Sequence, residues 1–139
     1  MNDPQRPETG RERSIVIIPT YNEADNILAV IEQVAALPDR VDVLVVDDGS
    51  PDTTAKRVRS AVDRYGDQVH LIERSGKLGL GTAYILGFRY ALDNGYTYIC
   101  EMDADLSHNP ADLARLIEPV RLDQRFNIGE VAHPVAPQA

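Results

Sequence analysis

The chain has 139 residues, of which 43% are hydrophobic and 26% charged, a composition typical of one globular domain. Its formal net charge of −8 argues against a nucleic-acid-binding protein, because such proteins neutralise phosphates with an excess of Lys and Arg. The single cysteine excludes an intramolecular disulfide and a cysteine-based metal cluster, and it favours a reducing, cytoplasmic setting.

The N-terminal part of the chain predicts a disordered tail followed by a strand and a helix. Residues 1–13 are polar and lack the apolar core of a signal peptide, and no apolar run approaches the roughly 20 residues of a transmembrane helix. The β-branched run at 14–18 predicts a strand that ends at Pro19. An apolar stripe from Ile27 to Leu37 has helical spacing, so a helix is expected after the strand.

A second strand and helix follow. The run 41–46 is rich in valine and predicts a strand, which Asp47-Asp48-Gly49 ends. Ser50 and Pro51 predict the N-cap and the first position of a helix that continues to Gly66.

The same order of strand, motif and helix recurs further along the chain. Residues 69–72 predict a strand, and a glycine-rich loop leads from it to a helix at 82–94. Residues 98–102 predict another strand, in which Cys100 is expected to be a small buried hydrophobe and not a nucleophile. The Asn-Pro pair at 109–110 marks the start of a further helix.

Almost wholly apolar strands that alternate with helices are typical of parallel strands covered on both faces and joined by right-handed crossovers. The predicted fold class is therefore α/β, with a doubly wound, mainly parallel sheet. In such a sheet the segments that follow the strands gather at the carboxyl edge, where ligands bind. The polar motifs expected at this edge are residues 19–23, 47–50, 75–81 and 103–108.

Asp103 and Asp105 follow the last predicted strand at positions i and i+2. Side chains with this spacing can project to one side, where their mutual repulsion favours a divalent cation. The alternative is a solvated turn that leads into the next helix. His108 is either a metal ligand or a hydrogen-bonding partner at the entry to that helix.

Asp47 and Asp48 point to opposite sides if the strand continues through them, so only one is expected to face the ligand cleft. That carboxylate can accept hydrogen bonds from a nucleobase N–H or a ribose hydroxyl. The alternative is an Asp-Gly turn that caps the next helix, which is more plausible for Asp47. Tyr21 either stacks on a base or packs beside the first helix, and the sequence favours neither.

The segment 74–82, Arg-Ser-Gly-Lys-Leu-Gly-Leu-Gly-Thr, invites a phosphate-loop interpretation. It lacks the Gly-Lys-Ser/Thr ending of a Walker A motif, and Tyr84 stands where a dinucleotide-binding motif has its last glycine. What remains is a flexible loop with two cations, Arg74 and Lys77, before a helix N-terminus, which suits a diphosphate or an acceptor phosphate. A plain surface loop is the alternative. The candidate residues of this phosphate or acceptor loop are Lys77, Gly79 and Gly81.

These motifs resemble those of glycosyltransferase family 2, inverting nucleotide-sugar-dependent enzymes with the GT-A fold, and within it the dolichol- or polyprenol-phosphate mannosyltransferases. The resemblance is carried by Pro-Thr-Tyr-Asn-Glu at 19–23, Val-Asp-Asp-Gly-Ser-Pro-Asp at 46–52, Gly-Lys-Leu-Gly-Leu-Gly-Thr-Ala-Tyr at 76–84 and Asp-Ala-Asp-Leu-Ser-His at 103–108. The last two motifs are the more specific for the polyprenol-phosphate branch. The resemblance covers residues 14–120, which are expected to form a GT-A nucleotide-sugar-binding domain.

The resemblance also implies roles for individual residues. The guanosine pocket would be lined by Pro19, Tyr21, Glu23, Val46 and Asp48. The sugar diphosphate would be met by Asp103, Ala104 and Asp105, the first and last of them catalytic. Mg²⁺ or Mn²⁺ would be held by Asp105, with Asp103 and Ser107 near it.

The implied reaction is the transfer of mannose from GDP-mannose to a dolichyl or polyprenyl phosphate, with inversion at the anomeric carbon. The metal would stabilise charge on the departing GDP, and an anionic lipid phosphate would need no strong general base. The expected location is the cytoplasm, with peripheral association at the cytoplasmic face of a membrane. The alternatives are a UDP-sugar-dependent lipid-phosphate glycosyltransferase and a nucleotide-binding remnant without catalysis.

Residues 121–139 show no clear periodicity and are expected to form an irregular tail. Members of the family continue for a further stretch that supplies basic residues, the acceptor site and often membrane-facing helices. We therefore expect the N-terminal half of a GT-A domain, in which nucleotide binding is retained and acceptor binding is weak. The expected explanations are a fragment, a truncated gene product, or a partner chain that supplies the missing half.

Overall fold

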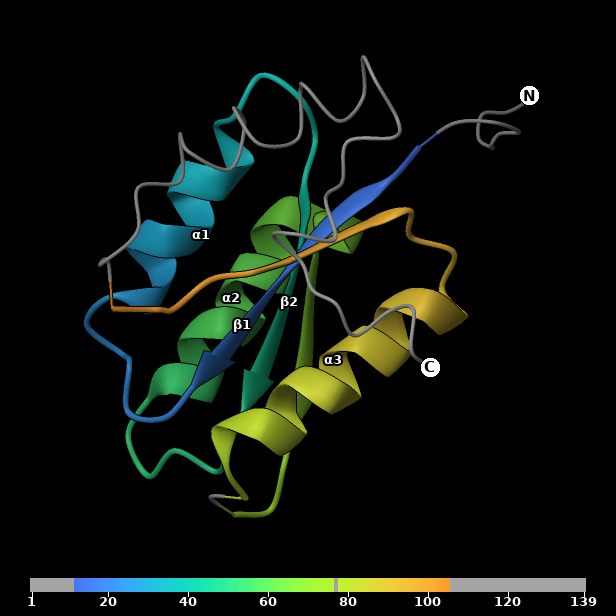
Figure 1. Ribbon diagram of the computed structural model, residues 1–139. Coiled ribbons are helices and arrows are strands. Elements are labelled where there is room, and N and C mark those ends of the chain that lie inside the picture. The colour runs from blue at the N-terminus through green and yellow to red at the C-terminus, as the bar shows by residue number, and fades with distance from the viewer. Residues whose placement is uncertain (1–11, 77, 106–139) are drawn as a thin grey trace.

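A computed structural model describes residues 12–76 and 78–105 of the chain (Figure 1). Within them the elements are β1 (Ser14–Thr20), α1 (Ile27–Ala35), β2 (Asp42–Asp47), α2 (Thr54–Tyr65), the 3₁₀ turn η1 (Gly66–Gln68), β3 (Val69–Glu73), α3 (Leu80–Asp93) and β4 (Tyr98–Glu101). Of the expected N-terminal tail only Glu12 and Arg13 are described. The helix expected from 109–110 and the tail expected at 121–139 lie outside the described residues.

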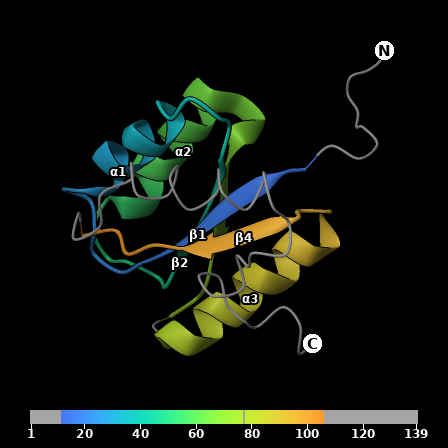
Figure 2. The same cartoon turned by 45° about the horizontal axis from the view of Figure 1, so that its top comes forward.

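The strands form a four-stranded parallel sheet with the order β3-β2-β1-β4. β1 is central, with Ile17 beside Leu44 of β2 and Glu101 of β4. α1 and α2 cover one face of the sheet and α3 covers the other (Figure 2). The predicted α/β fold with a doubly wound, parallel sheet is confirmed. None of the helices in the described part of the chain has the length and apolarity needed to span a bilayer.

The central strand is buried on both faces because its side chains enter two separate hydrophobic clusters. Val16 and Ile18 pack with residues of α1 and α2, while Ile15 and Ile17 pack with residues of α3. All of them are 0% exposed. Their unbroken apolar sequence follows from this arrangement, since alternate residues of a strand face opposite sides and both sides are covered.

Cys100 of β4 is 1% exposed and belongs to the cluster formed with α1 and α2. Burial, with a smaller contribution from the charge of Glu101, raises the pKa of its thiol to about 12. A thiol in this state is a poor nucleophile, so the predicted role as a buried hydrophobe is confirmed.

α3 approaches the sheet closely at Gly87. A Cβ atom there would lie 2.6 Å from Cγ2 and 2.9 Å from Cδ1 of Ile17, which is closer than side chains pack in proteins. The helix begins at Leu80, earlier than the predicted Thr82, and Gly79 is its N-cap. This packing brings the N-terminus of α3 to the carboxyl edge of the sheet.

Pro19 does not end β1, contrary to the prediction, because the strand continues to Thr20. The carbonyl of Thr20 accepts a hydrogen bond from the N–H of Asp48 beside it (3.0 Å), so Pro19, one residue earlier, turns its backbone to the β4 side. β4 ends at Glu101, which pairs with Ile17, and therefore stops short of Pro19. The missing N–H of proline removes no hydrogen bond from the sheet.

α2 begins at Thr54, so the predicted start at Ser50 and Pro51 is wrong. The hydroxyl of Ser50 donates to Oδ1 of Asp47 (2.7 Å) and does not cap the helix. The N–H of Thr54 donates to Oδ1 of Asp52 (2.9 Å), which forms a side-chain turn directly before the helix.

Candidate active site

The polar motifs that follow β1, β2 and β4 meet at the carboxyl edge of the sheet, as predicted. Together with the start of α3 they enclose a pocket of about 240 Å³. Its lining consists of Pro19, Thr20, Tyr21, Glu23, Asp48, Gly79, Leu80, Asp103, Ala104 and Asp105. A larger depression of about 570 Å³ lies along β3, between α2 and α3, but no predicted site residue lines it. The carboxyl-edge pocket is therefore the candidate site.

Most of the predicted site residues within the described part of the chain line this pocket. Val46 does not, because it is 0% exposed and packs in the cluster under α3, where it offers no surface to a ligand. Gly81 is exposed in the first turn of α3 but is not part of the lining. Outside the described residues lie Lys77, Ser107 and His108. Thr20 and Leu80 also line the pocket. They belong to the motifs 19–23 and 75–81, but neither was predicted as a site residue by itself.

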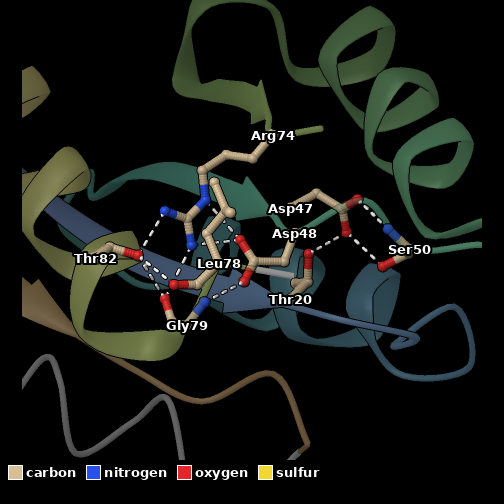
Figure 3. Close-up of polar contacts among 8 residues, drawn as sticks. All are labelled: Thr20, Asp47, Asp48, Ser50, Arg74, Leu78, Gly79 and Thr82. Atoms are coloured by element: carbon tan, nitrogen blue, oxygen red, sulfur yellow. Dashed lines mark hydrogen bonds and ion pairs between the residues drawn. The ribbon is translucent and has the colours of Figure 1, made fainter. Parts of the chain in front are cut away.

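Asp47 and Asp48 point away from each other (Figure 3), as the strand pattern predicts. Asp47 is 1% exposed and does not line the pocket. Its carboxylate accepts hydrogen bonds from Oγ1 of Thr20 (2.6 Å) and from both the N–H (3.0 Å) and the hydroxyl (2.7 Å) of Ser50. Asp47 therefore joins β1 to the loop that follows β2, and Asp48 is the residue that faces the pocket.

The loop after β1 is held by side chains of the loop after β2 and of the first residue of α2. Three main-chain N–H groups of the loop after β1 donate hydrogen bonds to side-chain oxygens: Asn22 to Oγ of Ser50 (2.8 Å), Glu23 to Oγ1 of Thr54 (2.9 Å) and Ala24 to Oδ2 of Asp52 (3.3 Å). We call these three hydrogen bonds the loop clamp. Asn22 has a φ of 57°, a left-handed conformation that asparagine tolerates better than most residues. The clamp fixes the backbone that presents Tyr21 and Glu23 to the pocket.

Replacing Asp47 by alanine is expected to lower the free energy of unfolding by about 2–4 kcal/mol, because the buried hydroxyl of Thr20 and the half-buried N–H and hydroxyl of Ser50 would lose their acceptor. Urea denaturation measures the change. Asp63→Ala on α2 removes the same charge from an exposed position and should stay within about 0.5 kcal/mol of the wild type. Equal midpoints for all three proteins would show that Asp47 does not hold these loops together.

Asp48 forms a buried ion pair with Arg74 behind the wall of the pocket (Figure 3). Nε of Arg74 lies 2.6 Å from Oδ1 of Asp48, and each side chain is 9% exposed. The same guanidinium donates to the hydroxyl of Thr82 and to the carbonyl of Gly79. The interpretation of Arg74 as a loop cation free to meet a phosphate is therefore wrong.

Carboxylates from separate segments concentrate negative charge at the pocket. Asp103 and Asp105 are exposed in its lining. The pKa of Glu23 is raised, chiefly by burial and further by repulsion from Asp105 and Asp103, although a hydrogen bond from Asn26 opposes the rise. Burial and the charge of Asp103 likewise raise the pKa of Glu101. A cation bound at this end of the pocket would relieve the repulsion.

The carboxylate oxygens of Asp103 and Asp105 are the hard ligands that Mg²⁺ and Mn²⁺ prefer. Within residues 12–76 and 78–105, no group of three or more His, Cys, Asp or Glu side chains could hold an ion by itself. The pair therefore fits a cation that takes its remaining ligands from water or from the phosphates of a bound ligand, as Mg²⁺ commonly does.

Comparison with known proteins decides the family. The model described as Glycosyl transferase family 2 matches residues 15–134, a span that runs past residue 120, where we expected the pattern to end. The chain belongs to glycosyl transferase family 2. This membership confirms the family that the motifs at the carboxyl edge predicted.

Two curated proteins of known name are similar to this member of glycosyl transferase family 2. It is 43% identical over 118 residues to the polyprenol monophosphomannose synthase of Mycolicibacterium smegmatis and 47% identical over 111 residues to the undecaprenyl-phosphate mannosyltransferase of Micrococcus luteus. The alignments cover 85% and 78% of this chain and 44% of each relative. The chain thus spans less than half the length of these relatives.

Solved structures of glycosyltransferases share the fold. The mannosyltransferase PcManGT from Pyrobaculum calidifontis, in complex with GDP-Man and Mn²⁺, matches with a TM-score of 0.65 at 32% identity, over 81% of this chain and 33% of that chain. Glucosyl-3-phosphoglycerate synthase from Mycobacterium tuberculosis matches with a TM-score of 0.57 at 24% identity, over 78% of this chain and 39% of that chain. The described residues of this family 2 chain form part of a GT-A fold, as predicted.

Proposed function

We propose that this chain supplies the donor-binding part of a metal-dependent, inverting mannosyltransferase that moves mannose from GDP-mannose to dolichyl or polyprenyl phosphate. The observation that carries the proposal is the pocket, in which Asp103 and Asp105 lie together with Asp48 and Tyr21. The names of the two curated relatives support the polyprenyl-phosphate acceptor, and the complex of PcManGT with GDP-Man and Mn²⁺ supports the donor and the metal.

The guanosine would occupy the part of the pocket near Tyr21 and Asp48. Tyr21 is 37% exposed and lines the pocket, and an aromatic ring is suited to stacking on a base. The carboxylate of Asp48 is an acceptor for an N–H group of the base. Pro19 and Glu23 complete this side of the lining.

The diphosphate would lie at Asp103, Ala104 and Asp105. A divalent ion held by the two aspartates would stabilise the negative charge on the departing GDP. No histidine is among the residues that line the described pocket. The proposed acceptor does not need one, because a phosphate monoester is already anionic at neutral pH.

The lipid acceptor determines the setting of the reaction. Its hydrocarbon tail lies in a bilayer, so the proposal includes a cytoplasmic location and peripheral association of the chain with a membrane surface. The chain spans 44% of the length of the two curated relatives, and we propose that it binds the acceptor weakly and transfers mannose slowly.

The proposal is tested by incubating the chain with labelled GDP-mannose, a short polyprenyl phosphate and Mn²⁺, and by measuring calorimetrically the affinities for GDP and UDP. We expect labelled lipid to form, transfer to stop when EDTA is added, and GDP to bind more tightly than UDP. Tighter binding of UDP would contradict the donor assignment. Metal-dependent GDP binding without transfer would favour the nucleotide-binding remnant.

A further inference from the structure

Arg74 lies behind the wall of the pocket and connects separate segments of the chain. It directly follows β3, and its own N–H donates to the carbonyl of Asp47 (2.8 Å). Its guanidinium contacts Asp48 after β2, and Gly79 and Thr82 at the start of α3 (Figure 3). The side chain is 9% exposed, and charge-assisted hydrogen bonds are strong in such a setting.

The donors of the guanidinium are almost fully used by these contacts. Nε donates to Oδ1 of Asp48 (2.6 Å), and Nη2 contacts both that oxygen and the carbonyl of Gly79 (2.9 Å). Nη1 donates to the hydroxyl of Thr82 (2.8 Å), which leaves a single N–H outside these contacts. A phosphate that accepted two N–H groups from this guanidinium would have to displace a bonded partner, so the arrangement suits a structural task better than bidentate anion binding.

The ion pair gives the carboxylate of Asp48 one orientation. Oδ1 receives both contacts from Arg74, and Oδ2 accepts the N–H of Gly79 at 3.3 Å. A carboxylate oxygen has lone pairs for about two hydrogen bonds, so Oδ2 keeps an acceptor position. Asp48 lines the pocket, where a ligand could use this acceptor position.

The same arginine fixes the start of α3. Gly79 has a φ of +105°, a conformation that side chains rarely adopt, and both its N–H and its carbonyl are held, by Asp48 and by Arg74. The hydroxyl of Thr82, which accepts from Arg74, also lies 3.0 Å from the carbonyl of Gly79. Leu80 follows directly and lines the pocket. Arg74 therefore determines where the polar side chain of Asp48 and the apolar side chain of Leu80 lie relative to each other in the pocket wall.

We propose that Arg74 is a positioning residue that determines which nucleobase the pocket accepts. By fixing Asp48 it leaves an acceptor for a base that presents an N–H group, and by holding Gly79 it sets Leu80 beside that acceptor. The inference rests on the function proposed above and deepens it, since it names what orients the base-binding carboxylate. Because the contacts of Arg74 are made to Asp48 and to the start of α3, its loss affects base binding more than diphosphate binding.

The test compares Arg74→Lys with Arg59→Lys, a matched control on α2 whose side chain is 57% exposed. Lysine keeps the charge but cannot make the planar, multiple contacts of a guanidinium. Calorimetry in the presence of Mn²⁺ gives the affinities for GDP, UDP and inorganic pyrophosphate. For Arg74→Lys we expect GDP affinity to fall roughly 10- to 100-fold, the GDP-over-UDP preference to shrink, and pyrophosphate affinity to stay unchanged. Arg59→Lys should match the wild type in all three.

Amide hydrogen exchange provides a second measurement that needs no ligand. The N–H of Gly79 should exchange at least about tenfold faster in Arg74→Lys than in the wild type or in Arg59→Lys. Thr82→Val removes the hydroxyl contact with Nη1 and keeps the ion pair, so it should change the same quantities in the same direction by less. If Arg74→Lys does not fold, Thr82→Val is used for the same measurements in its place.

Equal losses of GDP and pyrophosphate affinity, or an unchanged GDP affinity, would overturn the proposal. Unchanged exchange at Gly79 would overturn it as well, whether or not a nucleotide binds. A wild-type chain that binds Mn²⁺ and pyrophosphate but neither nucleotide would refute the proposed function, and the exchange rates would then decide whether Arg74 holds the loop.

Discussion

Asp105→Ala is expected to lower mannosyl transfer by roughly 10²- to 10³-fold and to remove the Mn²⁺ dependence of GDP binding. Asp105 lines the pocket together with Asp103, and this pair is the candidate cation site. With one carboxylate the site loses a ligand and part of the negative charge that attracts the ion. The loss should appear in kcat as well as in GDP affinity, since the charge on the departing diphosphate would no longer be stabilised.

Transfer of labelled mannose to a short polyprenyl phosphate, measured over a titration of Mn²⁺, checks this expectation. Asp63→Ala on α2 is the control, because it removes the same charge from an exposed position outside the pocket. Transfer by Asp105→Ala at the rate of this control would contradict the assignment of the cation site.

The pKa of Glu23 provides an independent measurement of the effect of Asp105→Ala. This pKa is raised by burial and, to a smaller extent, by repulsion from Asp105. Removal of that repulsion should therefore lower the pKa of Glu23, while the part of the rise due to burial remains. Titration of the Glu23 side chain by NMR in both proteins measures the difference, and an unchanged value would mean that the two groups lie too far apart to share one electrostatic site.

Gly87→Val is expected to lower the free energy of unfolding by about 2–4 kcal/mol, because the added side chain would overlap with Ile17 in the central strand. Ile17 is 0% exposed and packed between β-strands and α3, so it has little room to move. The slightly better helix propensity of valine offsets only a small part of this cost. Urea denaturation monitored by circular dichroism measures the effect.

Gly81→Ala in the same helix is the matched control. A Cβ at Gly81 would meet nothing within 4 Å, so the change should raise the free energy of unfolding by up to about 1 kcal/mol through helix propensity alone. If Gly87→Val were as stable as Gly81→Ala, α3 would have to pack farther from β1 than the structure has it.

The strands could be predicted because their signal is local. Ile15 to Ile18 are buried on both faces, and such strands have apolar sequences that need no knowledge of the rest of the chain. The end of β1 could not be predicted in the same way. Whether Pro19 breaks the strand depends on which neighbour its backbone faces and on where β4 stops, and both are set by residues far along the chain.

At Ser50 the sequence signal for a helix start is overridden by hydrogen bonds that the side chain makes elsewhere. Serine before proline is a good start for a helix, but here its hydroxyl binds Asp47 and accepts the N–H of Asn22 from another loop. The helix therefore starts later, at Thr54.

The sequence predicted which loops form the candidate site more reliably than it predicted which side chains of those loops face the pocket. The carboxyl edge follows from the α/β order, and the family motifs identified most of the residues that line the pocket. The burial of Val46 depends on the packing of α3 over the sheet. The state of Arg74 depends on its partner Asp48, which is 26 residues earlier in the chain. No local pattern distinguishes such a buried arginine from a free one.

The loop clamp separates the residues that maintain the shape of the site from those that meet a ligand, which matters for engineering. Ser50, Asp52 and Thr54 bind main-chain N–H groups, and every amino acid except proline provides one. A library that varies the side chains of Tyr21 and Glu23 and leaves the clamp intact can therefore explore new ligands on a backbone that keeps its path.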